Sequence, residues 1–416
     1  MSKTKISIGL LVALVAALLF IPIGASAKEP RKSAPGQSRP TPCVPLEGCI
    51  PTISTAKIGR EARFYVGGHW EGKPDHKIMY GSMYVEEWVP KKIEHPYPVV
   101  FVLGGGGQGM FAAMQTPDGR PGWAYNFVDA GYTVFMVDPP GAGRSAYFPG
   151  LYPPLSSPRS ARILEEEWTG GRPPTPKMQK GWPQWKLYTQ WPSNSPDKGK
   201  IGDPVFDYYA ETEVQHIDGY QEKLFSEALI KLLDLIGKPV IMLVNSGYAP
   251  SGWDAADARP KLIKSILAVE PWAPPIENAE LGATGPGRVW GLSNLPLHYY
   301  PPVTNPAQLR PYQKKTVSAP GLVPCWLQTP PAHKLINFEH VRVLQIAGQA
   351  SYHIPYTRCV AEWLNQAGVK TTYVKLQDVG LPGNGHQMMS EKDSEGIATF
   401  MMQWLAKNVP GDVLHK

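Results

Sequence analysis

Residues 243–250 read LVNSGYAP, in which Ser246 follows an apolar run and precedes small residues and a proline. A strand that turns sharply through a serine into a helix is a nucleophile elbow, which usually reads G-x-S-x-G because two backbones approach closely at the flanking positions. Here those two positions hold Val244 and Tyr248. By this motif alone, Ser246 is either a nucleophile on an altered turn or a serine that ends a strand.

Short apolar runs alternate with helical patterns after Pro98, which is typical of parallel strands covered by helices on both faces. A hairpin of alternating residues precedes them, in ARFYVGGHWEG and IMYGSMYVEEWVP. The clearest helix ends at Gly237, just before the serine strand, and a closing helix is predicted over about residues 392–407. The predicted parallel strands are 99–103, 132–138, 240–244, 265–270, 341–348 and 371–380.

The alternation stops between about residues 147 and 218, where proline, glycine and tryptophan are frequent. A structureless loop of that length would be unusual in a compact domain. We expect a cap inserted over the carboxyl ends of the strands, where open α/β sheets bind ligands. A second excursion is predicted on the same side, over about residues 271–340.

The first 27 residues have the features of a signal peptide: Lys3 and Lys5, an apolar stretch, and the small residues Ala25-Ser26-Ala27. We predict cleavage after Ala27, with an uncleaved membrane anchor as the alternative. Residues 28–54 are rich in proline and predict an extended arm, so that residues 55–416 form the α/β domain. The predicted location is secreted or periplasmic, with no membrane contact after cleavage.

The composition is that of a globular protein, with 416 residues of which 43% are hydrophobic. The net charge is +6, and no basic run is present that would follow a phosphate backbone, which excludes nucleic acid as an expected partner. The sequence does not decide between a monomer and a homodimer.

Four cysteines are present, and they allow three disulfide pairings. In an oxidising compartment we favour Cys43 with Cys49 and Cys325 with Cys359. None of the four has the spacing of metal ligands, so we predict neither a metal nor a cofactor.

Acyl transfer by serine needs a histidine to accept the proton and a carboxylate to orient that histidine, and in α/β-hydrolases these follow in the order serine, acid, histidine. His386 lies in LPGNGHQMM, a glycine-rich loop after the last predicted strand. Glu270 stands at the carboxyl end of SILAVE, 24 residues after Ser246. Asp378 is the competing acid, although its place within a strand pattern favours a structural role. We predict Ser246, Glu270 and His386 as the catalytic set.

The glycine run VLGGGGQG after the first parallel strand frees backbone N–H groups to face an anion. This loop supplies one oxyanion donor in α/β-hydrolases, and the residue after the nucleophile supplies the other. We therefore predict an oxyanion hole of Gly105, Gly106 and Gly247. A nucleotide site is disfavoured because the lysine and serine or threonine of a P-loop are missing.

These residues resemble those of secreted bacterial arylesterase-like α/β-hydrolases of the esterase 713 type. The resemblance spans about residues 60–408 and includes TPDGRPGWAYNFVDAGYTVFMVDPPGAGRS, VWGLSNLPLHYYPPV and GLPGNGHQMMSEKDS. It implies an α/β-hydrolase fold, export, disulfide bonds, and Ser246, Glu270 and His386 as the triad. The chain departs from these relatives around the serine, where they tend to have histidine before it and glutamine-glycine after it, and at Leu103, where many have histidine.

Two functions remain open from the sequence. The first is a serine hydrolase of small-molecule carboxylic esters, with aryl or medium acyl groups preferred to long lipids, and with lactones as a further substrate class. Tyr248, Trp272 and Trp326 are the predicted lining of its aromatic pocket. The second is a binding protein of the same fold that lost turnover, for which the altered elbow is the evidence.

Overall fold

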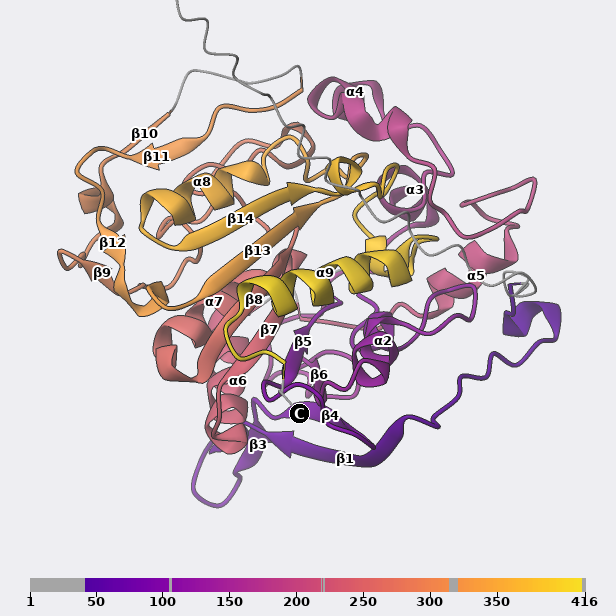
Figure 1. The fold of residues 1–416 in the computed structure, drawn as a ribbon, viewed down its shortest axis with the longest axis horizontal. Helices are drawn as coiled ribbons and strands as arrows, with labels where there is room; N and C mark the ends of the chain where they lie inside the picture. The colour runs from indigo at the N-terminus through magenta and orange to yellow at the C-terminus, as the bar shows by residue number, and fades with distance from the viewer. Residues whose placement is uncertain (1–41, 105–106, 218, 220, 314–320, 414–416) are drawn as a thin grey trace, which may run out of the picture. The chain divides into compact units, whose positions relative to one another are not determined.

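An eight-stranded sheet, in which every strand except β4 runs in the same direction, organises the computed structural model (Figure 1). The structure describes residues 42–104, 107–217, 219, 221–313 and 321–413. The strand order is β1-β4-β6-β5-β7-β8-β13-β14, with β4 antiparallel to both β1 and β6. The bounds are β1 (Ile58–Val66), β4 (Met83–Pro90), β5 (Val99–Val102), β6 (Val134–Asp138), β7 (Val240–Asn245), β8 (Ile263–Val269), β13 (Arg342–Ala347) and β14 (Lys370–Lys375). The predicted hairpin and all six predicted parallel strands are present.

Helices cover both faces of this sheet, as the apolar strands require. On β5, Val100 and Val102 pack on one side while Val99 and Phe101 pack on the other. The first side is covered by α6 (Glu222–Ile236), α7 (Ala249–Ala258) and α8 (Arg358–Gln366), and the second by α1 (Phe111–Met114), α2 (Trp123–Asp129) and α9 (Ser394–Asn408). The α/β-hydrolase architecture predicted from the sequence is confirmed.

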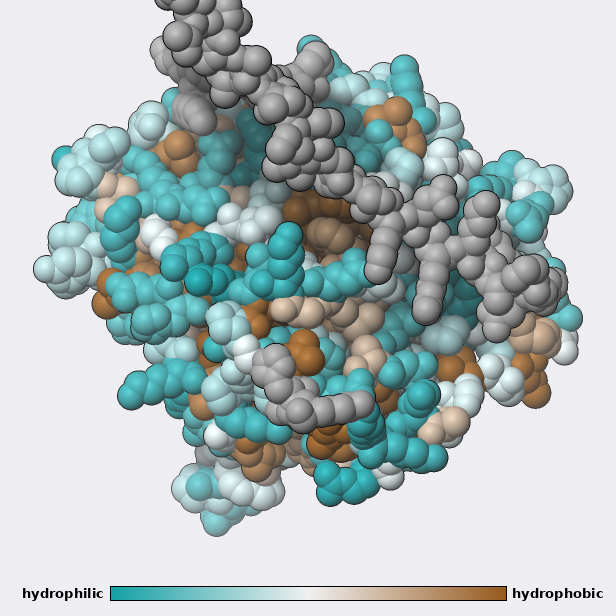
Figure 2. Space-filling view, in the orientation of Figure 1, coloured by the Kyte–Doolittle hydropathy of each residue, from teal (hydrophilic) through white to brown (hydrophobic). Residues whose placement is uncertain are grey.

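Two long helices show why the sequence folds in this way. Helix α6 ends where Gly237 takes a left-handed conformation (φ 65°), and the Gly237 N–H caps the Leu233 carbonyl. Helix α9 buries Ile397, Met401 and Leu405 against the sheet. Hydrophilic residues predominate on the face of the molecule that Figure 2 shows, which is the face that α9 crosses in Figure 1.

The insertion between β6 and α6 has its own small core, which includes Trp168, Trp182 and Trp191. Its indoles contact loops at the carboxyl ends of the strands: Trp182 donates to the Ala350 carbonyl at 3.1 Å. Val44 of the N-terminal arm is fully buried in the same core. The helical elements are α3 (Ala161–Ile163), η2 (Leu164–Trp168), α4 (Pro176–Gly181), η3 (Pro183–Leu187) and α5 (Pro204–Glu211).

The second excursion, between β8 and β13, is built from short strands and turns. They are η6 (Glu280–Gly282), β9 (Tyr299–Tyr300), η7 (Pro306–Leu309), β10 (Pro311–Gln313), β11 (Trp326–Gln328), β12 (Lys334–Leu335) and η8 (Ile336–Phe338). The remaining short elements are η1 (Pro45–Glu47), β2 (His69–Glu71), β3 (Ile78–Tyr80), η4 (Ser246–Tyr248), η5 (Pro260–Leu262), η9 (Leu376–Val379) and η10 (Met388–Ser390).

The two disulfides, Cys43–Cys49 and Cys325–Cys359, are the pairs that the sequence favoured. The predicted signal peptide, residues 1–27, and the arm up to residue 41 lie outside the described residues. Within the part of the chain that the structure describes, no helix is both long and apolar enough to cross a membrane.

Candidate active site

Ser246 stands on the turn between β7 and α7, at the carboxyl end of a central strand. Its φ of 46° is a left-handed conformation that is rare for residues other than glycine, and it starts the short helix η4. Just before it, the Asn245 side chain donates to the Val269 carbonyl at 3.1 Å, which ties β7 to the end of β8. The serine is thus held in a strained conformation on a rigid turn, as an elbow requires.

The space for Val244, the first of the two altered elbow positions, comes from the helix that follows. A Cβ atom added to Gly252 of α7 would lie 2.4 Å from Cγ1 of Val244. The close approach of strand and helix is therefore retained, with the glycine on the helix and the side chain on the strand. Gly252 was visible in the sequence, but only the fold reveals that it faces Val244.

Tyr248, the second altered position, is almost fully buried. Its ring meets Phe225 of α6 edge to face at 5.2 Å, within the core beneath the turn. The first helical turn after the serine places this side chain against α6, and its predicted role in the substrate pocket stays a prediction.

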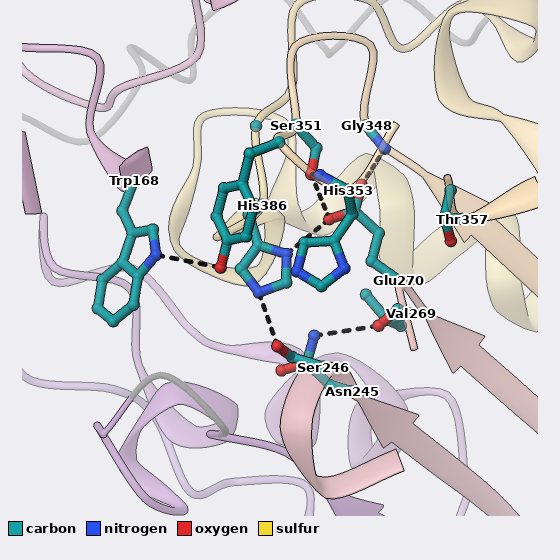
Figure 3. A network of polar contacts seen from close by, with 12 residues as sticks. Trp168, Asn245, Ser246, Val269, Glu270, Gly348, Ser351, His353, Thr357 and His386 are labelled. Carbon is teal, nitrogen blue, oxygen red and sulfur yellow. Dashed lines mark hydrogen bonds and ion pairs between the residues drawn. The ribbon is translucent and has the colours of Figure 1, made fainter. Parts of the chain in front are cut away.

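Ser246, His386 and Glu270 form one hydrogen-bonded series (Figure 3). The Ser246 Oγ lies 3.1 Å from Nε2 of His386, and Nδ1 of His386 lies 2.6 Å from Oε2 of Glu270. Glu270 is fully buried and His386 is 1% exposed, so no bulk water competes for these contacts. A hydroxyl, an imidazole and a carboxylate in this order can activate the hydroxyl as a nucleophile.

Glu270 is held by the loop that follows β13. The Gly348 N–H donates to its Oε1 at 2.7 Å, and the Ser351 hydroxyl donates to its Oε2 at 2.6 Å. The competing acid, Asp378, lies in η9 after β14 and not inside the strand as predicted. Its carboxylate pairs with Lys375 at 3.4 Å. Asp378 therefore does not contact His386.

The loop that carries His386 is fixed by a carboxyl group that the sequence did not single out. Glu391 is fully buried and accepts hydrogen bonds from the Asn384 side chain and the Gly385 N–H, both at 2.9 Å. Burial raises the pKa of Glu391 to about 8, although these hydrogen bonds oppose the shift. Its position five residues after the histidine was the only signal available from the sequence.

The glycine run after β5 contains the oxyanion donors predicted for that loop. Gly105 and Gly106 lie outside the described residues, so the predicted oxyanion donors of this loop stay a prediction. At the neighbouring Gly104 (φ 96°), an added Cβ would lie 2.2 Å from the Gly109 carbonyl oxygen. Gly247, the other predicted donor, is buried directly after Ser246.

No family model matches the sequence. The chain is 37% identical over 351 residues, which is 83% of this chain and 89% of the relative, to a protein described as the probable secreted lipase phiG from Fungal sp. (strain ATCC 74256). The chain belongs to the esterase and lipase family of α/β-hydrolases. A solved structure described as a novel bacterial esterase has the same fold, with a TM-score of 0.54, 17% identity, and coverage of 86% of this chain and 98% of that chain.

Membership of this family makes the protein an exported hydrolase of carboxylic esters, in agreement with the predicted leader and the two disulfides. The family resemblance stated from the sequence is therefore confirmed. For an esterase of this fold, the hydrogen-bonded series at the carboxyl ends of β7 and β8 is the candidate catalytic centre.

Three aromatic rings beside this centre were not predicted as a group. The rings of His353 and His386 are stacked, with centroids 4.1 Å apart and an angle of 1° between their planes. Tyr352 contacts both rings, at 4.6 Å and 4.8 Å, and its hydroxyl accepts a hydrogen bond from Trp168 of the insertion at 3.4 Å. His353 lies in the segment AGQASYHIPYT, which has no glycine-rich loop pattern like the one that marks His386.

Glu270, His353 and His386 are also close enough to suggest a metal site, since their ligand atoms lie within 4.8 Å of one another. An imidazole nitrogen binds a metal in the plane of its own ring at about 2 Å. The two rings here are parallel and 4.1 Å apart, so their nitrogen lone pairs do not converge on one point. The geometry suits a hydrogen-bonded series better than an ion.

The predicted pocket tryptophans lie in the second excursion, at different distances from the centre. The Trp272 N–H donates to the Ser246 carbonyl at 3.1 Å, and its indole donates to Glu280 at 2.7 Å. Trp326 instead donates to Glu277 and lines a separate cavity of about 200 Å³ next to Cys359. Trp272 is therefore placed beside the site, whereas the pocket role predicted for Trp326 is not supported.

Proposed function

We propose that this protein is a secreted serine esterase that cleaves its substrate through an acyl-enzyme on Ser246. His386 accepts the Ser246 proton as the hydroxyl attacks the ester carbonyl, and it passes that proton to the departing alcohol. Water then attacks the acyl-enzyme: His386 accepts a proton from the water and returns it to Ser246 as the carboxylic acid departs. Glu270 keeps Nδ1 of His386 protonated and stabilises the imidazolium. The observation that carries the proposal is the series of contacts at 3.1 Å and 2.6 Å.

The developing oxyanion needs donors, and we assign this role to the N–H groups of Gly247 and of Gly105 or Gly106. The burial of Gly247 directly after the strained Ser246 supports its part. Removal of one such donor typically costs about 3 kcal/mol of transition-state stabilisation.

The substrate class that we propose is esters with aryl or medium acyl groups, with lactones as a second class. Aromatic side chains beside the centre support this choice: Tyr352 touches His386, Trp168 bonds to Tyr352, and Trp272 follows Glu270. Flat apolar groups pack favourably against such rings.

The alternative from the sequence, a binding protein with a degenerate elbow, loses its main support. Its evidence was the pair of residues Val244 and Tyr248, and both are accommodated without loss of the turn, the first by Gly252 and the second by the core around Phe225.

The experiment is to label the mature protein with a fluorophosphonate and to measure hydrolysis of short nitrophenyl esters. Ser246→Ala should abolish labelling and lower kcat by about four to six orders of magnitude. Ser251→Ala is the matched control, because this buried hydroxyl on the next helix donates only to the Glu222 carbonyl among the described contacts. An unlabelled wild type, or a labelled and active Ser246→Ala, would overturn the proposal.

A further inference from the structure

His353 is a buried histidine to which the proposed mechanism gives no step. It is 0% exposed, and it lies in the segment between β13 and α8. Its Nδ1 is hydrogen-bonded to the Tyr356 hydroxyl at 2.7 Å. Among the residues that the structure describes, its Nε2 has no hydrogen-bond partner, and the Glu280 carboxyl group lies 3.8 Å away.

Packing alone does not account for a histidine at this place. A buried nitrogen without a partner costs free energy, and a phenyl ring would fill the same space without that cost. What the imidazole adds is an in-plane bond to Tyr356, which fixes the orientation of the His353 ring. That ring in turn lies flat on His386, with 1° between the two planes (Figure 3).

The hydrogen bonds of His386 do not fix the plane of its ring, and the tilted Tyr352 ring touches it without stacking on it. The bond from Nδ1 to Glu270 fixes one edge of the ring but does not by itself fix the tilt of the plane about that edge. A small tilt carries Nε2, on the opposite side, away from the Ser246 oxygen. Misplacement of a reacting group by about 1 Å can cost a hundredfold in rate.

The same segment also holds the other partner of His386. The backbone N–H of His353 donates to the Ser351 hydroxyl oxygen at 3.0 Å, and the Ser351 hydroxyl donates to Glu270. The carboxylate and the plane of the imidazole are thus set by residues only two positions apart in the chain.

We propose that His353 is a positioning residue, which holds the plane of the His386 ring so that Nε2 stays directed at Ser246. This inference rests on the proposed function of Ser246 and His386. His353 can do this without opposing the imidazolium that forms on His386, because burial, followed by the nearby His386, holds the pKa of His353 well below its usual value and keeps it neutral.

Three substitutions at His353 distinguish the role of its flat ring from the role of its hydrogen bond to Tyr356. His353→Phe keeps a flat ring without the bond to Tyr356, His353→Gln keeps a polar group without a ring, and His353→Leu keeps neither. We expect kcat to fall about tenfold to a hundredfold in the glutamine and leucine variants, with KM within about twofold of the wild type. The phenylalanine variant should recover a substantial part of the lost kcat.

The matched control is Phe338→Leu, which removes another fully buried ring, one that packs beside Trp253 and is not among the described contacts of His386. It should lower the melting temperature and leave kcat unchanged. If His353→Phe does not fold, Tyr356→Phe replaces it, with an expected fall in kcat of about twofold to fivefold at unchanged KM.

Wild-type kcat in both His353→Gln and His353→Leu would overturn the positioning role, as would a change in KM alone or an equal loss of kcat in Phe338→Leu. These outcomes are distinct from failure of the proposed function, which is indicated by activity in Ser246→Ala. In that case the inference about His353 falls with it.

Discussion

At the scale of single residues, two residues of the candidate centre have strained backbone conformations. Ser246 and Glu270 have φ values of 46° and 44°, although neither is glycine. They end the adjacent strands β7 and β8, and the Trp272 N–H joins the two turns by its bond to the Ser246 carbonyl at 3.1 Å. Strained conformations of this kind persist where the surrounding structure fixes them, and they gather at functional sites.

Glu270→Gln is a sharp test of the acid because the structure fixes which way the amide must turn. The Gly348 N–H donates to Oε1, so the amide oxygen of glutamine takes that position and the NH2 group faces Nδ1 of His386. An NH2 group there stabilises the tautomer with a proton on Nε2, which cannot accept the Ser246 proton. We expect kcat to fall about ten-thousandfold on nitrophenyl esters, as for the equivalent change in a serine triad.

Asp378→Asn is the control for that substitution. Asp378 lies in η9 and its side chain is more than half exposed, beside Lys375. Its kcat should stay within about twofold of the wild type, since an exposed ion pair contributes little. The assignment of Glu270 is wrong if Asp378→Asn is the crippled variant and Glu270→Gln is not.

At the scale of elements, the sequence predicted what depends on local pattern. Each parallel strand is a short apolar run because it is buried on both faces, and helix α6 could be located from its apolar spacing and Gly237. The prediction missed contacts between loops that are distant in sequence. Ser351 and Gly348 reach Glu270 across about 80 residues, and no periodicity in the chain records such a meeting.

The pairing of β7 with α7 gives a prediction at this scale. An alanine at Gly252 would place its Cβ 2.4 Å from Val244. Although alanine favours a helix over glycine by about 1 kcal/mol, we expect the overpacking to dominate and to lower the free energy of unfolding by about 1–3 kcal/mol. Val244→Ala removes the obstructing methyl groups. The loss in free energy of unfolding of the double variant should therefore be smaller than the sum of the two single losses, by at least about 1 kcal/mol.

Urea unfolding of the four proteins of this cycle measures the coupling. Gly396→Ala in α9 is the matched control, because its added Cβ would meet only the end of the Leu381 side chain, at 3.1 Å. That variant should be neutral or slightly stabilised. Additive losses at Val244 and Gly252 would show that the glycine on the helix does not replace the missing glycine of the elbow.

At the scale of the whole molecule, burial keeps several carboxyl groups protonated near neutral pH. Burial raises the pKa of Glu391 to about 8, and burial together with Glu222 raises the pKa of Asp254 to about 8. Burial and Glu280 raise the pKa of Glu167 to about 7. These groups lie behind the His386 loop, on α7 and in the insertion, so their effect belongs to the fold and not to one site.

The consequence for stability follows from proton linkage. In the unfolded chain these carboxyl groups release their protons near pH 4, whereas in the folded chain they keep them to pH 7 or 8, so the folded state binds more protons between those values. The free energy of unfolding must then fall as the pH rises through that window. His353 acts in the opposite direction below about pH 6.5, because its pKa is lowered in the folded state.

Above about pH 6.5 His353 is mostly neutral in both the folded and the unfolded chain, so the carboxyl groups of Glu391, Asp254 and Glu167 dominate. We therefore expect the free energy of unfolding to fall between pH 6.5 and 8. Each proton contributes a slope of about 1.4 kcal/mol per pH unit. Urea unfolding at several pH values should show that Glu391→Gln and Asp254→Asn each flatten this slope, whatever they do to the stability itself, because neither amide ionises. Glu395→Gln, on the exposed side of α9, should leave the slope as it is. A free energy of unfolding that rises over this range would mean that Glu391 and Asp254 are already ionised in the folded protein.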